Sequence, residues 1–239
     1  MKNALVTGGS GAIGAAICRR LAADGCHVYI HAHRGVQAAQ VLADAIRAGG
    51  GSAQALAFDV TDSRATAAVL TPIVERQTIQ ILVNNAGIND DAVFPGMTAL
   101  QWHRVIDVSV NGFFNVTQPL LLPMIRSRWG RIINVSSIAS LTGNRGQVNY
   151  SAAKGALNSA TKSLAQEVAS RGITVNAVAP GIIDTPMSAS AFDAEAIARV
   201  VPMKRAGTPA EVADLIGFLA STQAAYITGQ IISINGGII

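Results

Sequence analysis

The first apolar stretch of this chain leads directly into a run of small residues. Ala4–Thr7 has the pattern of a short strand, and Gly8–Gly14 (GGSGAIG) connects it to an amphipathic segment. Small residues allow a backbone to approach a phosphate closely, and the free N–H groups at a helix N-terminus favour an anion. A strand, a glycine-rich turn and a helix in this order predict a dinucleotide-binding turn that opens a layered α/β domain.

Apolar strands continue to alternate with amphipathic helices along the 239 residues. We expect strands at Ala4–Thr7, Val28–Ala32, Ala53–Phe58, Ile79–Val83, Arg131–Val135, Ile173–Val178 and Gln230–Ile234. We expect helices at Ile13–Asp24, Gln37–Ala48, Ser63–Gln77, Leu100–Arg128, Asn149–Ser170 and Ala210–Ala220. This pattern predicts a parallel sheet with helices on both faces. The length suits one domain, so residues 1–239 should form a single-domain Rossmann fold, a doubly wound parallel sheet of about seven strands.

The least regular stretch of the chain is Asp184–Ala206, which follows the sixth expected strand. Ligands of doubly wound sheets bind at the carboxyl ends of the strands. Because this stretch begins at such an end, we expect it to act as a mobile substrate lid over the site.

Tyr150 and Lys154 lie four residues apart on the expected helix Asn149–Ser170, so they extend from the same helical face. A tyrosine with its ordinary pKa of about 10 is a poor acid-base catalyst at neutral pH. A fixed positive charge nearby is expected to lower that pKa. A tyrosine adjusted in this way can protonate a carbonyl oxygen or take a proton from an alcohol.

The end of the second expected strand indicates which nicotinamide cofactor would bind. It reads Ile30-His31-Ala32-His33-Arg34, without the acid that usually holds the ribose 2′-hydroxyl of NAD. Arg34, helped by His33, can pair with a 2′-phosphate instead. We therefore expect NADP(H).

Taken together, these segments resemble the short-chain dehydrogenase/reductase family along essentially the whole chain. The glycine turn is similar to the family pattern Thr-Gly-x-x-x-Gly-x-Gly, with Ala12 in place of the middle glycine, a change that a negative φ would permit. Ser137, Tyr150 and Lys154 match the catalytic serine and the Tyr-x-x-x-Lys pair of the family.

The resemblance also implies the cofactor-binding residues. It implies that Asp59-Val60 contacts adenine, that Asn84–Gly87 (NNAG) packs beside the cofactor, and that Pro180–Thr185 (PGIIDT) holds the nicotinamide carboxamide. The full set of expected cofactor-binding residues is Gly8, Ser10, Gly11, Ala12, Ile13, Gly14, His33, Arg34, Asp59, Val60, Asn85, Ala86, Gly87, Tyr150, Lys154, Pro180, Gly181, Ile183 and Thr185.

The implied chemistry is hydride transfer from NADPH to a ketone carbon. Tyr150 would protonate the alkoxide, Lys154 would lower the tyrosine pKa and bind the nicotinamide ribose, and Ser137 would orient the substrate oxygen. The family commonly adds a catalytic asparagine whose backbone holds a relay water. Alignment places Ser109 at that position, with Asn111 two residues further on and facing elsewhere around the helix.

Within the family, the chain is most similar to reductases of 3-oxoacyl groups carried on acyl carrier protein. The similarity is clearest in Gly130–Ser137, Gly143–Lys154 and Ser170–Asn176. In those enzymes a pair of basic residues near the site docks the acidic carrier, and the matching residues here are Arg128 and Arg171. The resemblance further implies a homotetramer.

Two segments are similar to reductases of aryl-polyene pigment synthesis, namely Asp90–Pro95 and Ile231–Gly237. Two alternatives to the thioester reductase remain open. One is a reductase of free small ketones, sugars or steroids, and the other is a catalytically silent NADP-binding regulatory protein. Reduction of carrier-bound chains would separate the first from the leading interpretation, and turnover of any ketone would exclude the second.

The amino-acid composition limits the kinds of partner and ligand expected for this chain. The net charge is +4, but no basic run with interleaved aromatic residues indicates nucleic-acid binding, so an acidic carrier is the better match. Cys18 and Cys26 are too few to suggest a disulfide framework, so we expect reduced thiols. No signal peptide or membrane-spanning run is apparent, so we expect a cytoplasmic protein. The four histidines lack metal-ligand spacing, so no metal site is expected.

Overall fold

Seven parallel strands form the central sheet of the computed structural model, which describes residues 1–186 and 193–239. In sheet order they are β3 (Ser52–Ala57), β2 (His27–Ala32), β1 (Asn3–Val6), β4 (Ile81–Asn84), β5 (Gly130–Val135), β6 (Ile173–Pro180) and β7 (Ile231–Ile234). Every neighbouring pair is parallel. The single-domain Rossmann fold with a doubly wound sheet is thus confirmed.

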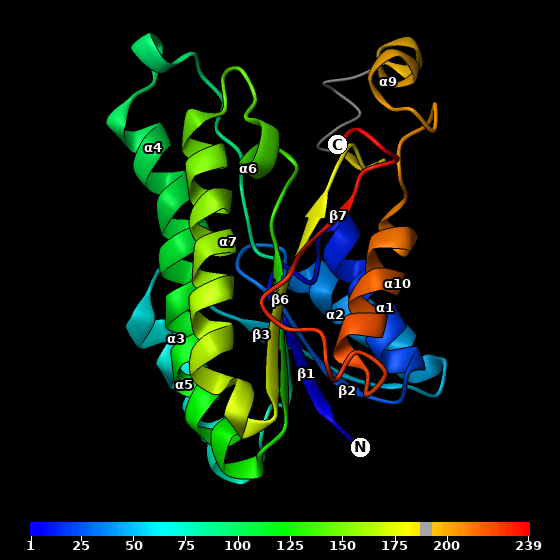
Figure 1. The fold of residues 1–239 in the computed structure, drawn as a ribbon. Helices are drawn as coiled ribbons and strands as arrows, with labels where there is room; N and C mark the ends of the chain where they lie inside the picture. Colours follow the sequence, from blue (N-terminus) through cyan, green and yellow to red (C-terminus); the bar gives the residue numbers. More distant parts are fainter. Residues whose placement is uncertain (187–192) are drawn as a thin grey trace.

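Helices cover both faces of this sheet (Figure 1). On one face lie α1 (Ala12–Ala23), α2 (Val36–Ala48) and α10 (Pro209–Ala220). On the other lie α3 (Ser63–Arg76), α4 (Ala99–Ile106), α5 (Gly112–Ser127) and α7 (Val148–Val168). Both faces of the five inner strands are therefore buried, which explains their mainly apolar sequences.

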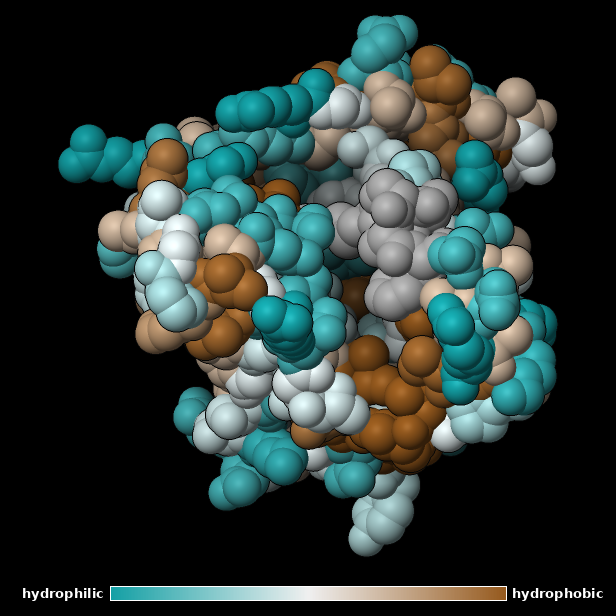
Figure 2. All heavy atoms as spheres, turned by 90° about the horizontal axis from the view of Figure 1, so that it is seen from above, coloured by the Kyte–Doolittle hydropathy of each residue, from teal (hydrophilic) through white to brown (hydrophobic). Residues whose placement is uncertain are grey.

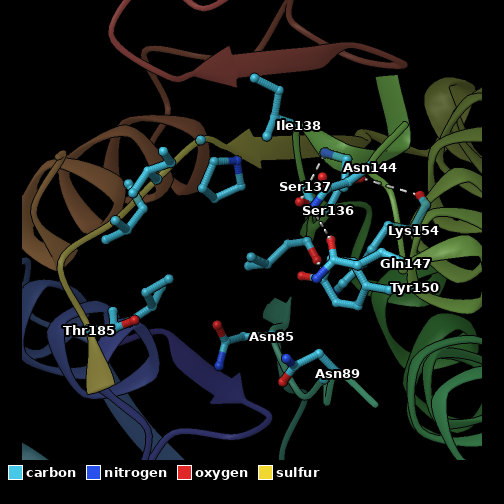
Figure 3. A pocket seen from close by; sticks show the side chains of 18 of the residues that line it. Asn85, Asn89, Ser136, Ser137, Ile138, Asn144, Gln147, Tyr150, Lys154 and Thr185 are labelled. Carbon is cyan, nitrogen blue, oxygen red and sulfur yellow. Dashed lines mark hydrogen bonds between the residues drawn. The ribbon is translucent and has the colours of Figure 1, made fainter. Parts of the chain in front are cut away.

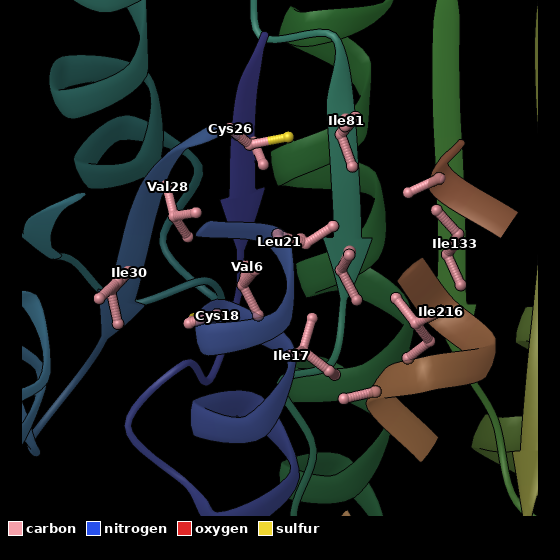
Figure 4. Packing of buried hydrophobic residues seen from close by; sticks show 14 of the residues in the cluster. Val6, Ile17, Cys18, Leu21, Cys26, Val28, Ile30, Ile81, Ile133 and Ile216 are labelled. Carbon is pink, nitrogen blue, oxygen red and sulfur yellow. The ribbon is translucent and has the colours of Figure 1, made fainter. Parts of the chain in front are cut away.

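Two apolar clusters hold the layers together, one on each face of the sheet. In the first, Ile17 and Leu21 of α1 pack against Val6 and Val28, and Ile216 of α10 packs near Ile133 (Figure 4). Burying a side chain of this size stabilises a fold by roughly 1.5–3 kcal/mol relative to exposure. The two clusters thus hold the strands in place relative to one another.

The strand order reverses between β1 and β4, which are neighbours in the sheet although two strands separate them in sequence. The connections that leave these two strands pass to opposite faces, so a crevice opens between them. A buried polar chain supports the same region. Asn84 Nδ2 donates to Asn134 Oδ1 at 2.9 Å, and Asn134 Nδ2 donates to Thr161 Oγ1 at 2.8 Å. It ties β4 and β5 to α7.

The region expected as one helix, Leu100–Arg128, is instead interrupted. A π-helical turn, η2 (Asp107–Asn111), joins α4 to α5, and Arg128 ends α5 with φ 51°. Gly112 follows the turn, and a Cβ there would lie 2.9 Å from Val60 Cγ2. Because Gly112 has no side chain, the start of α5 can lie close to the segment after β3. Apolar spacing alone does not distinguish it from a regular α-helix.

Two short elements were not expected from sequence, η1 (Phe94–Gly96) and α6 (Ala139–Thr142), and the expected helix Asn149–Ser170 ends in a 3-10 turn, η3 (Ala169–Arg171). The expected lid, Asp184–Ala206, is more regular than anticipated, because it contains α9 (Ala194–Val200). Its residues 187–192 lie outside the described residues. Its two ends are held together where Asp184 N–H donates to Gly207 O at 2.8 Å and Gly207 N–H donates to Ile182 O at 2.9 Å.

Among the helices of the described residues, none is both long and apolar enough to cross a membrane.

Candidate active site

A cavity of about 810 Å³ opens at the carboxyl ends of the strands. Figure 2 looks down on this face and shows that it is hollowed near its centre. The lining comes from the turn after β1, the segments after β4, β5 and β6, and the first turns of α7. The expected site residues that line it are Gly8, Ser10, Gly11, Ala12, Ile13, Gly14, Asn85, Ala86, Gly87, Ser137, Tyr150, Lys154, Pro180, Gly181, Ile183 and Thr185.

The glycine turn directs the start of α1 at this cavity. The first hydrogen bond of α1 runs from Ala15 N–H to Gly11 O, so the N–H groups of the three preceding residues point outward from the helix end. No side chain caps this end, and the first turn carries no acidic residue. These features fit a group that brings negative charge, such as a dinucleotide pyrophosphate.

Close packing explains two residues of this turn. A Cβ at Gly14 would lie 2.2 Å from Gly8 O, so the helix can contact the turn only with glycine there. Ala12 is the first residue of α1, and the non-glycine residues with positive φ in the described chain are Arg128 and Lys204. The negative φ that would permit alanine at position 12 is therefore present.

Hydrogen bonds from the end of β4 hold the turn in place. Asn85 Nδ2 donates to Thr7 O at 3.0 Å and to Gly8 O at 3.1 Å. In return, Thr7 Oγ1 accepts the N–H groups of Asn85 and Ala86, each at 3.0 Å. The Asn-Asn-Ala-Gly motif therefore has a structural role at the mouth of the crevice.

The residues expected at the adenosine end lie beside the cavity rather than in its lining. His33 Nε2 is 3.6 Å from Asp59 Oδ2, and Arg34 is exposed next to them. Although partial burial opposes ionisation of Asp59, hydrogen bonds from Thr61 and the charges of His33 and Arg34 hold its pKa below the ordinary value. Val60 lies beyond Asp59, against the π-helical turn.

The three expected catalytic residues converge on one side of the cavity (Figure 3). Ser137 follows β5, and its hydroxyl hydrogen-bonds the phenol of Tyr150 near the start of α7. One helical turn later, Lys154 Nζ donates to Val135 O at 2.7 Å and lies 5.7 Å from the centre of the tyrosine ring. A Cβ at Gly87 would lie 3.1 Å from this ammonium, so glycine there leaves it room.

Burial has the largest effect on the pKa values of Tyr150 and Lys154. It raises the pKa of Tyr150, partly offset by the hydrogen bond with Ser137 and reinforced by Asp91. A Tyr150 pKa below its ordinary value is therefore not found in this structure, because burial outweighs the lowering effect of Ser137. Burial also lowers the pKa of Lys154 to about 8. At neutral pH the phenol is protonated and therefore ready to give a proton to a carbonyl oxygen.

A family model described as short chain dehydrogenase matches residues 2–196. The chain belongs to the short-chain dehydrogenase/reductase family. It is 43% identical to a 3-oxoacyl-[acyl-carrier-protein] reductase of Aggregatibacter actinomycetemcomitans, an alignment that covers 98% of each chain.

Two other relatives show the same extent of similarity. A 3-oxoacyl-[acyl-carrier-protein] reductase of Aquifex aeolicus is 42% identical over 99% of this chain and 96% of its own. A protein named nodulation protein G of a Rhizobium species gives the same three values. The similarity thus extends over nearly the full length of all three relatives.

This short-chain dehydrogenase/reductase also has a polar rim that sequence reasoning missed. Asn144 Nδ2 donates to Gln147 Oε1 at 2.9 Å, and Gln147 Nε2 donates to Asp91 Oδ2 at 2.8 Å. These residues and Asn89 line the cavity beside Tyr150. Asp91 and Gln147 occur in segments that carried the family resemblance, but only the fold brings them together.

Ser109, the expected relay position, lies buried in the π-helical turn. Its Oγ has no hydrogen-bond partner among the described residues and borders a separate cavity of about 10 Å³. Thr7, Asn84 and Leu157 also line that small cavity, whereas Lys154 does not. Asn111 is exposed and donates to Asp107 Oδ1 at 2.7 Å, so it does face elsewhere.

Arg128 and Arg171 lie close to each other but far from the catalytic residues. Arg128 Nη2 donates to Ser170 O at 3.2 Å, and both arginines are exposed. They precede β5 and β6, whereas Ser137 follows β5, so the length of that strand, roughly 20 Å, separates them from the site. The expected position near the site is therefore wrong within a single chain.

The described residues contain no group of three or more histidine, cysteine or acidic side chains arranged to hold a metal ion.

The buried ammonium of Lys154 should cost stability. We expect Lys154→Met to have a free energy of unfolding about 1–3 kcal/mol larger than that of the wild type at pH 7, although it removes one of the expected catalytic groups. The folded-state pKa is lowered from 10.5 to about 8, so the unfolded wild type binds more protons between these values. Wild-type stability therefore rises with pH across this window, and the advantage of the variant should shrink.

Denaturant unfolding at pH 7, 9 and 10.5 measures this effect. Lys162→Met, at an exposed position of the same helix, is the matched control and should show no such dependence. A Lys154→Met variant that is less stable than the wild type at pH 7 would contradict the prediction.

Proposed function

We propose that this chain reduces 3-oxoacyl thioesters carried on acyl carrier protein to 3-hydroxyacyl thioesters, with NADPH as the reductant. The observation that carries the proposal is the single cavity that joins the glycine turn to Ser137, Tyr150 and Lys154. The names of the full-length relatives support the choice of substrate class.

NADPH, when bound, would supply the hydride. The uncapped N–H groups of α1 would bind its pyrophosphate, and Pro180–Thr185, which follows the main part of β6, would hold the nicotinamide end. Ser137 would orient the ketone oxygen between its own hydroxyl and the phenol of Tyr150. Tyr150 would then protonate that oxygen as negative charge develops on it.

Lys154 has a supporting role in this scheme. Its Nζ spends one N–H on Val135 O, and its two further N–H groups are available to ribose hydroxyls. We retain Ser109 as the relay position, acting through its backbone carbonyl, because its side chain faces a cavity that Lys154 does not reach.

Three features support the finer parts of the proposal. The exposed Arg34 and the nearby His33 fit the 2′-phosphate of NADP(H). Pro186 and Val200 lie within 184–206 and line the cavity, which supports a substrate lid in that stretch. Exposed apolar side chains on α4 and α5, namely Leu100, Phe114 and Leu122, support burial between copies in a homotetramer.

Assembly would also change the role proposed for Arg128 and Arg171. Both arginines lie at the opposite end of the strands from the cavity of their own chain. A carrier docked on them would therefore serve the cavity of another copy. The carrier would be drawn by its negative charge.

NADPH oxidation by the purified protein tests the function. We expect the highest kcat/KM with a 3-oxoacyl group on acyl carrier protein, followed by the same group on a small thiol, and the lowest with free ketones. Fatty and aryl-polyene chains are compared on the same carrier. Tyr150→Phe keeps the ring and should lower kcat by roughly 10²–10⁴-fold with NADPH binding unchanged.

Faster turnover of free ketones would instead favour a small-ketone reductase. NADPH binding without turnover of any of these substrates would favour a silent binding protein.

Replacement of Arg34 tests the cofactor. Arg34→Ala should raise the KM for NADPH about 10- to 100-fold, because hydrogen bonds to charged groups contribute roughly 1.5–3 kcal/mol. It should leave the KM for NADH unchanged. Steady-state kinetics with both nucleotides measure the ratio, and Arg64→Ala, another exposed arginine, is the control. Equal effects on both nucleotides would argue against a 2′-phosphate contact.

Neutralising the docking pair tests the carrier. Arg128→Ala/Arg171→Ala should raise the KM for carrier-bound substrate roughly five-fold, since exposed ion pairs contribute about 0.2–1 kcal/mol each. The KM for the small thioester should not change. If both substrates were affected alike, or neither were, the carrier would dock elsewhere. Arg64→Ala again controls for net charge.

A further inference from the structure

His31 is a buried histidine that the chemistry above does not use. It lies near the end of β2 and is 2% exposed. Ile30 directs its side chain into the cluster shared with α1 (Figure 4), so alternation along the strand places His31 on the opposite face. There its ring packs against Phe58, with 4.0 Å between the ring centres.

Both ring nitrogens of His31 are hydrogen-bonded, and the partners define the tautomer. Gly8 N–H donates to Nδ1 at 3.2 Å, and Nε2 lies 2.9 Å from Phe58 O. Because a carbonyl oxygen can only accept, Nε2 carries the proton and Nδ1 offers its lone pair. Burial lowers the pKa of His31 to about 4, so the ring is neutral at pH 7 and this pattern is maintained.

The bond to Gly8 lies at the point where β1 becomes the glycine turn. Gly8 has φ 62°, and its carbonyl accepts from Asn85 Nδ2 on the β4 side. On the β2 side, His31 Nδ1 accepts the N–H of Gly8, and the backbone carbonyl of His31 accepts Gly9 N–H at 2.8 Å. One peptide segment is thus held by two neighbouring strands.

We propose that His31 is a positioning residue for the cofactor, whose Nδ1 holds Gly8 so that the turn presents the N–H groups of α1 to the pyrophosphate. This role rests on the proposed function, because nucleotide binding at the turn is itself part of that proposal. Without an acceptor at Nδ1, the partly buried Gly8 N–H is left unpaired and the turn must rearrange to satisfy it.

Two substitutions separate the two ring nitrogens. The Oδ1 of asparagine can occupy the place of Nδ1 and accept from Gly8, but the side chain is too short to reach Phe58 O. The Nε2 of glutamine can occupy the place of the histidine Nε2 and donate to Phe58 O, but it offers no acceptor to Gly8. Both variants lose the ring packing, so both should be less stable than the wild type.

The experiment measures the dissociation constant of NADPH by nucleotide fluorescence, together with the melting temperature and steady-state kinetics. We expect His31→Gln to weaken NADPH binding about ten-fold and to raise the KM for NADPH, with kcat at saturating cofactor nearly unchanged. His31→Asn should stay within about two-fold of the wild type in NADPH binding. His27→Gln, at the other end of β2, is the control and should change only the melting temperature.

Equal effects of His31→Asn and His31→Gln on NADPH binding would overturn the proposal, as would binding unchanged in both folded variants. If the wild type itself bound neither NADPH nor NADH, the proposed function would fail instead, so the two failures are distinguishable.

Discussion

Hydrogen bonds that join the ends of β1, β2 and β4 hold the glycine turn that this molecule presents at its carboxyl face. Thr7 Oγ1 accepts two backbone N–H groups from the end of β4, and Asn85 returns its amide to two carbonyls of the turn. The side chain of His31 completes the set from β2. None of these hydrogen bonds involves a charged side chain. Neutral groups with fixed geometry hold the turn instead.

The side of the cavity that holds Tyr150 and Lys154 differs, because a group that can carry charge is buried there. Lys154 is 3% exposed, and among the described residues its Nζ donates to one carbonyl, Val135 O. A buried ammonium is unfavourable for folding, and this shows in its lowered pKa. The fold tolerates the loss because two apolar clusters enclose the sheet on either side. Stability is thus given up at one residue that places a cation beside the ring of Tyr150.

Much of the fold follows from patterns that are local in sequence. Buried parallel strands are apolar on both faces, so each one was visible as a short run of apolar residues, and the glycine turn was visible from its spacing. The convergence of Ser137, Tyr150 and Lys154 followed from their places at a strand end and on one helical face. The π-helical turn did not follow, because Asp107–Asn111 keeps an apolar spacing that suits an α-helix equally well. The raised pKa of Tyr150 depends on burial by segments distant in sequence, as does the separation of Arg128 from the cavity.

The bridge between Ile183 and Gly207 joins the two ends of the stretch that contains α9. Since the chain leaves and rejoins the body of the protein at one point, the residues between can change in length or composition without altering the register of any strand. Tyr150 and the glycine turn are both anchored elsewhere. Under the proposed function, evolution could therefore alter which acyl chains are admitted independently of how they are reduced.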